Sequence, residues 1–241
     1  MHVWDVLTHP EESPPYGDVP VTEIVDSVTG EPTIGLEIGC NCGATGRELK
    51  RRFPSLFYVG VETCPVAATK AAERLDHVIA EDFLAWKGRL DIPGGRPVDL
   101  VVASDVLEHL YNPWATLEKI RGLLAPGAKL YATIPNIRNL WLLGELAAGR
   151  WNYERVGLLD ITHIRFFTLA TAMEMFQSTG YEILSVTALK DGRLPDLMPT
   201  TDQLVNIETE QMTLHKLDHD DVLELTALKF LIVASPTVVV R

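Results

Sequence analysis

The chain has 241 residues, 46% of them hydrophobic, and a formal net charge of -12 at pH 7. That length and composition suffice for one substantial core and fit a single domain with insertions. The acidic balance argues against nucleic-acid and anionic-membrane partners, because phosphate binding normally needs a basic face.

Targeting and redox features are sparse. The first ten residues lack the basic leader and apolar run of a signal peptide, and no apolar run reaches the length of a membrane span. The three cysteines, Cys40, Cys42 and Cys64, form an odd and scattered set. We therefore expect a reduced, cytoplasmic protein with no membrane association.

The first half of the chain alternates short apolar runs with helical stretches. The apolar runs predict strands at 34–38, 56–61, 78–80, 98–103 and 129–134. Helical spacing or composition predicts helices at 21–28, 47–53, 65–75 and 113–124. This alternation is typical of a parallel sheet with right-handed crossovers.

The second half departs from this alternation twice. A longer, mixed stretch at 137–168 predicts an insertion after the fifth strand, before a helix at 169–178 and a sixth strand at 181–187. A polar, proline-dotted stretch at 190–222 then precedes a last strand at 225–234. An insertion that long is either a lid or contact surface, or a variable solvated loop. We expect one domain, 1–241, carrying both insertions.

A glycine-rich turn follows the first strand. The strand carries one acid, Glu37, and the chain then runs through Gly39, Gly43 and Gly46 into a helix. Such a turn is where a doubly wound sheet holds a cofactor. A nucleotide triphosphate loop would need Gly-Lys-Ser/Thr, which is absent, and Asn41 replaces the second glycine of a dinucleotide fingerprint.

Acidic and polar residues follow the next three strands. Ligands of open parallel sheets bind outside the carboxyl ends of the strands. These ends carry Glu62, Asp82, Phe83, Ser104 and Asp105. The resulting rim is acidic, so it suits a cationic ligand better than a polyphosphate.

The glycine turn and these strand ends resemble the class I S-adenosylmethionine-dependent methyltransferases. Glu37-x-Gly39-x-Asn41-x-Gly43 is similar to the family's acid-x-Gly-x-Gly-x-Gly loop, and the resemblance extends over nearly the whole chain. It implies a Rossmann-like α/β fold: a seven-stranded, mostly parallel sheet with helices on both faces and an antiparallel last strand. Asn41 departs from the family's middle glycine, and asparagine tolerates the turn conformation better than most residues.

The resemblance implies S-adenosyl-L-methionine as cofactor and S-adenosyl-L-homocysteine as product. Backbone N–H groups of the glycine loop suit the carboxylate of the cofactor. In the family pattern Glu62 accepts hydrogen bonds from the ribose hydroxyls, Asp82 receives the adenine amino group, and Phe83 flanks the ring. Ser104 and Asp105 lie beside the methionine portion. The expected cofactor-binding set is Glu37, Gly39, Asn41, Gly43, Glu62, Asp82, Phe83, Ser104 and Asp105.

The acceptor side is predicted within 137–168. The segment from Gly157 to Thr168 resembles a subgroup associated with polysaccharide, O-antigen and other sugar modification, which implies a small-molecule or sugar acceptor, methylated at oxygen. We hypothesise that His163 is a general base oriented by Asp160, and that Arg165 anchors a polar part of the acceptor. The alternative is a structural network that pins this lid to the sheet.

The motif after the fourth strand offers a second base. His109 closes Asp105-Val-Leu-Glu-His, where it is either a base or a helix-start histidine bonded to backbone. Glu108 and His109 are weighed as ligands of a divalent ion, but no metal is expected. Asp99 is also typical of the family and is expected to serve the fold. The stretch 139–146 is a candidate homodimer contact. Aromatic residues near the lid are either a platform for a sugar or simple core: Trp141, Trp151, Tyr153, Phe166 and Phe167.

Three other functions stay open at this point. One is N- or C-methylation of a natural-product or quinone-like acceptor, which the fold does not exclude. Another is a nicotinamide-dependent oxidoreductase, disfavoured by Asn41 and by the acids Asp82 and Asp105. The last is a non-catalytic module that binds the cofactor or a partner.

Overall fold

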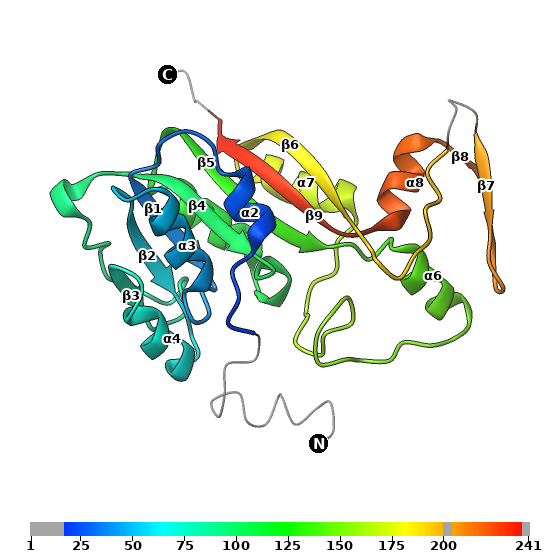
Figure 1. Cartoon of the computed structure of the whole chain (residues 1–241), viewed down its shortest axis with the longest axis horizontal. Helices are drawn as coiled ribbons and strands as arrows, with labels where there is room; N and C mark the ends of the chain where they lie inside the picture. The colour runs from blue at the N-terminus through cyan, green and yellow to red at the C-terminus, as the bar shows by residue number, and fades with distance from the viewer. Residues whose placement is uncertain (1–16, 200–203, 238–241) are drawn as a thin grey trace.

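The computed structural model describes residues 17–199 and 204–237; most of the proline-rich stretch 1–20 lies outside them. Its main sheet has seven strands in the order β3-β2-β1-β4-β5-β9-β6 (Figure 1). The strands are β1 (Ile34–Ile38), β2 (Phe57–Val61), β3 (His77–Ile79), β4 (Val98–Ser104), β5 (Leu124–Pro135), β6 (Tyr181–Lys190) and β9 (Ala227–Pro236). Strands β1 to β5 pair in parallel, and β9 runs antiparallel to both β5 and β6. The predicted fold class is confirmed.

Helices cover both faces of this sheet. The helices are α2 (Thr22–Ser27), α3 (Ala44–Arg52), α4 (Pro65–Ala72), α5 (Pro113–Arg121) and α7 (Leu169–Ser178). One buried cluster joins α2, α3 and α4 to the sheet, and a second joins α5 and α7 to it. Successive residues of a strand point to opposite faces. In β1, Ile34, Leu36 and Ile38 therefore enter one core, and Gly35 and Glu37 face the other side.

A buried tyrosine fills the space between β1 and α3. A Cβ at Gly35 would lie 2.3 Å from the Tyr58 ring, and one at Gly46 would lie 2.5 Å from it. Both glycines are thus required by the close approach of the helix to the sheet. Asp99 accepts hydrogen bonds from the backbone N–H groups of Thr33 and Ile34, at 3.0 and 3.0 Å, and so joins β4 to the start of β1. This is the expected role in the fold.

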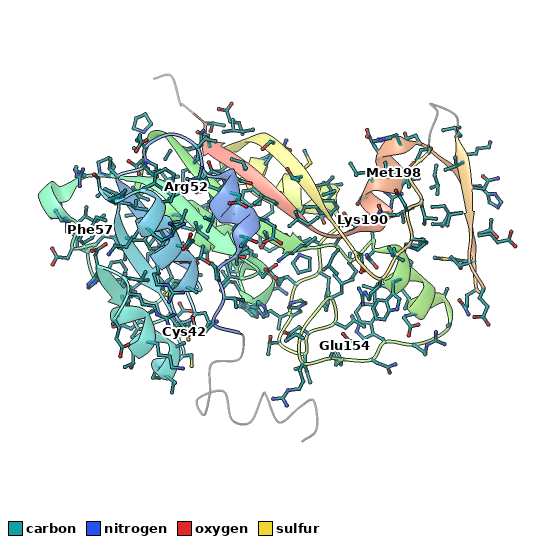
Figure 2. The ribbon with its side chains drawn as sticks, in the orientation of Figure 1. Cys42, Arg52, Phe57, Glu154, Lys190 and Met198 are labelled. Carbon is teal, nitrogen blue, oxygen red and sulfur yellow. The ribbon has the colours of Figure 1, made fainter. Side chains whose placement is uncertain are left out.

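The insertion before the last strand has regular structure. It contains the hairpin β7 (Val205–Glu208) and β8 (Thr213–Leu217), followed by α8 (His219–Thr226). These elements lie beside α6 (Leu140–Ala147) at one end of the molecule, with Met198 next to α8 (Figures 1 and 2). They share a small core: Leu140, Ile207, Leu217, Val222 and Leu225. We call these four elements the end unit.

The boundary expected for the last strand was wrong by two residues. Leu225 and Thr226 belong to α8, which begins after an Asp218 cap that accepts from the backbone N–H of Asp221. Leu225 turns into the core of the end unit, so its apolar character reflects a helix face rather than a strand. Within the described residues, no helix has both the length and the apolar character needed to cross a membrane.

Candidate cofactor and acceptor site

The carboxyl ends of β1, β2, β4 and β5 open into a cavity of about 1000 Å³. Except for Gly43, every residue expected to bind the cofactor lines this cavity. The expected catalytic residues His109, Asp160 and His163 line it as well. Cys42 of the glycine turn and Glu154 of the segment after α6 both lie below the sheet in the view of Figure 2. The cavity therefore joins the two halves of the predicted site.

The glycine turn is built from left-handed residues. The φ angles are +70° at Gly39, +47° at Asn41 and +76° at Gly43. A side chain at Gly39 would collide with Val106, since its Cβ would lie 2.7 Å from Cγ2 of that residue. The structure thus confirms that Asn41 takes the turn conformation expected of the replaced glycine. Gly43 caps the start of α3 behind the cavity wall.

Glu62 is held between two turns at the end of β2. Its Oε2 accepts from the backbone N–H of Asn41, and its Oε1 accepts from that of Cys64, each at 2.8 Å. A carboxylate oxygen has two lone-pair directions, so each oxygen retains capacity for a further donor. The side chain is fixed, on the cavity wall, in a geometry that suits a pair of vicinal hydroxyls.

Glu37 is a buried acid with an unsatisfied oxygen. Its side chain is 3% exposed, and its Oε2 has no hydrogen-bond partner among the described residues. Burial raises the pKa of Glu37 to about 8; the nearby Tyr58 hydroxyl opposes this rise, although its geometry does not satisfy a hydrogen bond. A buried carboxylate of this kind favours a cationic group beside it.

The end of β4 carries an ion pair that was not predicted from the sequence. The ammonium of Lys229, on β9, lies 2.7 Å from Oδ2 of Asp105, and both line the cavity. Asp105 itself has a φ of +46°, and its N–H donates to the Thr133 carbonyl at 3.1 Å. The signal for Lys229 was a single charge within the apolar run of the last strand.

Asp82 and Phe83 lie at the turn after β3. Oδ1 of Asp82 accepts from the Ala85 N–H at 2.8 Å, which orders the turn. The Phe83 ring is buried, and the Lys119 ammonium lies 4.6 Å from its centroid. Phe83 thus belongs to the core on one side while lining the cavity on the other.

Two histidines, one from the turn after β4 and one from the insertion, meet at the cavity. His109 ends the short helix η2 (Leu107–His109), and its ring centroid lies 4.6 Å from that of His163. The Thr162 hydroxyl donates to Asp160 Oδ1 at 2.6 Å and lies 2.9 Å from Nδ1 of His109. Nδ1 of His163 lies 3.2 Å from the Leu158 carbonyl.

Asp160 therefore orients His109 through Thr162. The hypothesis from the sequence was that Asp160 orients His163. Burial lowers the pKa of both histidines, so both rings are neutral near pH 7. A neutral imidazole with its proton on Nδ1 presents a lone pair at Nε2. This is the form that accepts a proton or binds a cation.

Arg165 holds the insertion against the turn after β4. Its guanidinium donates to the Tyr111 carbonyl at 2.6 Å and lies 5.3 Å from the centroid of that ring. The N–H groups of Ile164 and Arg165 both donate to the Glu108 carbonyl at 3.0 Å. Arg165 is not among the described residues that line the cavity, which favours the structural alternative for it.

The aromatic residues of the insertion pack against one another and against Trp114 of α5. Trp151 meets Phe166 edge to face at 5.6 Å between ring centroids, and Trp114 lies 6.3 Å from Phe167. No aromatic residue of the expected platform is among the described residues of the cavity wall. Phe167 is buried in the core, as the core alternative expects, whereas Tyr153 and Phe166 are 47% and 38% exposed and fit neither alternative.

Part of the chain is similar in sequence to known methyltransferases. Residues 36–130 match the family model of a methyltransferase domain, Methyltransf_12. The trans-aconitate 2-methyltransferase of Methylobacterium radiotolerans is 29% identical over 120 residues, which cover 48% of this chain and 44% of that protein. The chain thus spans less than half the length of that relative.

Solved structures share the fold across most of the chain. A SAM-dependent methyltransferase from Archaeoglobus fulgidus is 15% identical, with a TM-score of 0.58 over 89% of this chain and 90% of that one. The N-methyltransferase NodS from Bradyrhizobium japonicum, in complex with S-adenosyl-L-homocysteine, is 16% identical, with a TM-score of 0.56 over 98% and 99%. Residues 36–130 are thus similar to a methyltransferase domain, and the chain shares its fold with these methyltransferase structures.

Proposed function

We propose that the protein is an S-adenosylmethionine-dependent methyltransferase that acts on a small-molecule or sugar acceptor, at oxygen. The observation that carries the proposal is the single cavity that the glycine turn, Glu62 and the pair His109 and His163 all line. Methyl transfer is an in-line displacement, so its main demand is that acceptor, methyl and sulfur be held collinear. We call the side lined by the glycine turn, Glu62 and Asp82 the cofactor wall, and the side lined by Glu108, His109 and His163 the acceptor wall. A cavity that holds both substrates in this way meets the demand.

The cofactor wall fits the groups of S-adenosyl-L-methionine. Glu62 would accept from the ribose hydroxyls, and Asp82 would receive the adenine amino group. Glu37 has an orphaned, buried oxygen, and the ammonium of the cofactor is the kind of charge that such an oxygen needs. Ser104 and Asp105 would lie beside the methionine portion, where the cofactor supplies the electrophilic methyl.

The acceptor wall offers a base. His163 or His109 would take the proton of an acceptor hydroxyl, and Asp160 would orient His109 through Thr162. The segment from Gly157 to Thr168 favours a sugar or glycan. A small carboxylic acid is the second candidate, because Lys229 brings an ammonium to the cavity and a relative is named for trans-aconitate.

Calorimetry with S-adenosyl-L-homocysteine and with NAD tests the cofactor assignment. We expect the first to bind and the second not to. Glu62→Gln should weaken the binding about 10- to 100-fold, since hydrogen bonds to a charged group contribute about 1.5–3 kcal/mol. Glu73→Gln, at an exposed acid outside the cavity, is the matched control. Equal affinities of the two variants would contradict the role of Glu62.

A methyl-transfer assay tests the activity itself. The panel should contain nucleotide sugars, phenols and small carboxylic acids, with the position of the methyl group read by mass spectrometry. Binding of the cofactor without transfer to any acceptor would support the non-catalytic module instead. Transfer to nitrogen or carbon would replace oxygen as the methylated atom.

A further inference from the structure

Three potential metal ligands meet on the acceptor wall. Glu108, His109 and His163 each offer one ligand atom, and these atoms all lie within 4.8 Å of one another. Nε2 of His163 lies 3.8 Å from Oε1 of Glu108. All three residues line the cavity, so the cluster is reachable from the space that the acceptor would occupy.

Glu108 is the unusual member of this cluster. Its side chain is 1% exposed, and neither carboxylate oxygen has a hydrogen-bond partner among the described residues. The ammonium of Lys229 already lies 2.7 Å from Asp105. A buried acid normally pairs with a cation or coordinates a metal, because burying a carboxylate without compensation is costly.

The two histidines are oriented as ligands usually are. Nδ1 of His163 faces the carbonyl oxygen of Leu158 at 3.2 Å, and a carbonyl only accepts. Nδ1 of His109 lies 2.9 Å from the Thr162 hydroxyl, whose own hydrogen is donated to Asp160. Both rings thus carry their proton on Nδ1 and have their lone pair on Nε2. Metal-binding histidines are fixed by this kind of partner on the other nitrogen.

We propose that Glu108, His109 and His163 bind one divalent transition-metal ion, with an open coordination position toward the cavity. Two imidazoles and one carboxylate suit Zn²⁺ or another first-row ion, whereas Mg²⁺ and Ca²⁺ prefer oxygen ligands throughout. Bonds of about 2.1 Å place ligand atoms about 3–3.5 Å apart. The ligand atoms of the three residues now lie up to 4.8 Å apart, so side-chain shifts of about an ångström would bring them to this spacing. This proposal departs from the expectation, drawn from the sequence, that no metal is bound.

The role of the ion rests on the proposed function. An acceptor hydroxyl at the open position has a lowered pKa and loses its proton to solvent. Its oxygen lone pair then forms the bond to the methyl carbon, while the electron pair of the broken carbon–sulfur bond returns to sulfur. The cofactor leaves as a neutral thioether. In this arrangement the ion and solvent replace the general base of the proposed function, and His109 and His163 act as ligands of the ion.

Metal binding by the untagged full chain, stripped with a chelator, tests the site without cofactor or acceptor. Calorimetry with Zn²⁺ should give one equivalent, and Co²⁺ should give visible absorption bands of a nitrogen- and oxygen-ligated ion. Glu108→Gln and His163→Asn should each weaken Zn²⁺ binding at least about 100-fold, beyond the 10–100-fold typical of supporting residues. His215→Asn, at an exposed histidine of β8, is the control and should bind as the wild type does.

Thermal unfolding separates loss of the site from loss of the fold. Without metal, Glu108→Gln should melt at or above the wild-type temperature, because it removes a buried acid that lacks a partner. Zn²⁺ should raise the melting temperature of the wild type and of His215→Asn, but not of Glu108→Gln or His163→Asn.

The outcomes distinguish the two proposals. Absence of Zn²⁺ binding by the wild type, or equal binding by Glu108→Gln, overturns the metal site even if S-adenosyl-L-homocysteine binds and a methyl is transferred. Zn²⁺ binding that depends on Glu108 and His163, in a protein that does not bind S-adenosyl-L-homocysteine, upholds the metal site and overturns the proposed function.

Discussion

Among single residues, Glu37 of the candidate cofactor site makes the stability of the protein depend on pH. Its carboxyl group is buried at the end of β1, and burial raises its pKa to about 8, from an ordinary value of 4.5. The folded protein therefore keeps a proton that the unfolded chain releases between these two pH values. Folding stability contributed by this group is highest below pH 4.5 and falls as the pH rises toward 8.

Glu37→Gln should abolish this pH dependence. Relative to the variant, the cofactor-free wild type should lose about 1.4 kcal/mol of unfolding free energy per pH unit between pH 5 and pH 8. Urea unfolding of both proteins across that range measures the difference, in which titrations common to both cancel. If the unfolding free energies of the two proteins change with pH in the same way, Glu37 titrates near its ordinary pKa. The buried site would then be better solvated than its exposure indicates.

Residues of the site were predictable from the sequence where their signal is local. The turn conformation of Asn41 follows from its place in a glycine pattern, and Glu62 follows from its position at a strand end. Lys229 was missed because its partner, Asp105, lies 124 positions away in the chain. The contact of Thr162 with His109 spans 53 positions, and no spacing rule links them. Side-chain pairing across a fold has no local signature.

At the level of elements, the close approach of α3 to the sheet is set by a glycine inside a helix. Gly46→Ala would ordinarily stabilise a helix interior by about 1 kcal/mol. Here the new Cβ would lie 2.5 Å from the Tyr58 ring and 2.7 Å from the Leu75 side chain. We expect the substitution to lower the unfolding free energy by about 1–3 kcal/mol, as overpacking does.

Gly144→Ala, in α6, is the matched control for this prediction. A Cβ there has no neighbour within 4 Å, so the helix propensity of alanine should dominate and raise the stability by up to about 1 kcal/mol. Urea unfolding of both variants measures whether each substitution raises or lowers the unfolding free energy. A stabilising effect at both positions would mean that α3 moves away from the sheet at little cost.

Elements were predictable where one periodicity dominates. The helix Leu169–Ser178 was predicted with the bounds that the structure gives it. The hairpin of β7 and β8 was not predicted, because its short strands are mostly polar: in β8 only Leu217 is buried. Its apolar residues pack against α6 and α8, and that packing is determined by tertiary contacts rather than by local pattern.

At the scale of the whole molecule, the end unit is joined to the sheet by a polar network. Asn139, which caps α6, donates to Asp191 Oδ2 and to the Ala227 carbonyl, each at 3.0 Å. Arg138 reaches α8 through ion pairs with Asp221 and Glu224, at 2.7 and 2.6 Å. No described residue of 190–222 lines the cavity. The end unit is therefore separate from the candidate site although it is attached beside it.

Leu225→Ala tests whether the packing of the end unit affects binding in the cavity. Leu225 is buried in the small core, so the truncation should lower the unfolding free energy by about 2–5 kcal/mol. The control, Leu223→Ala in the same helix, removes a side chain that is 40% exposed and should have a smaller effect. Both variants should bind S-adenosyl-L-homocysteine with wild-type affinity while they are folded. If Leu225→Ala instead weakens that binding in the folded protein, packing in the end unit is coupled to the cavity through β9, the strand that carries Lys229 and follows α8 directly.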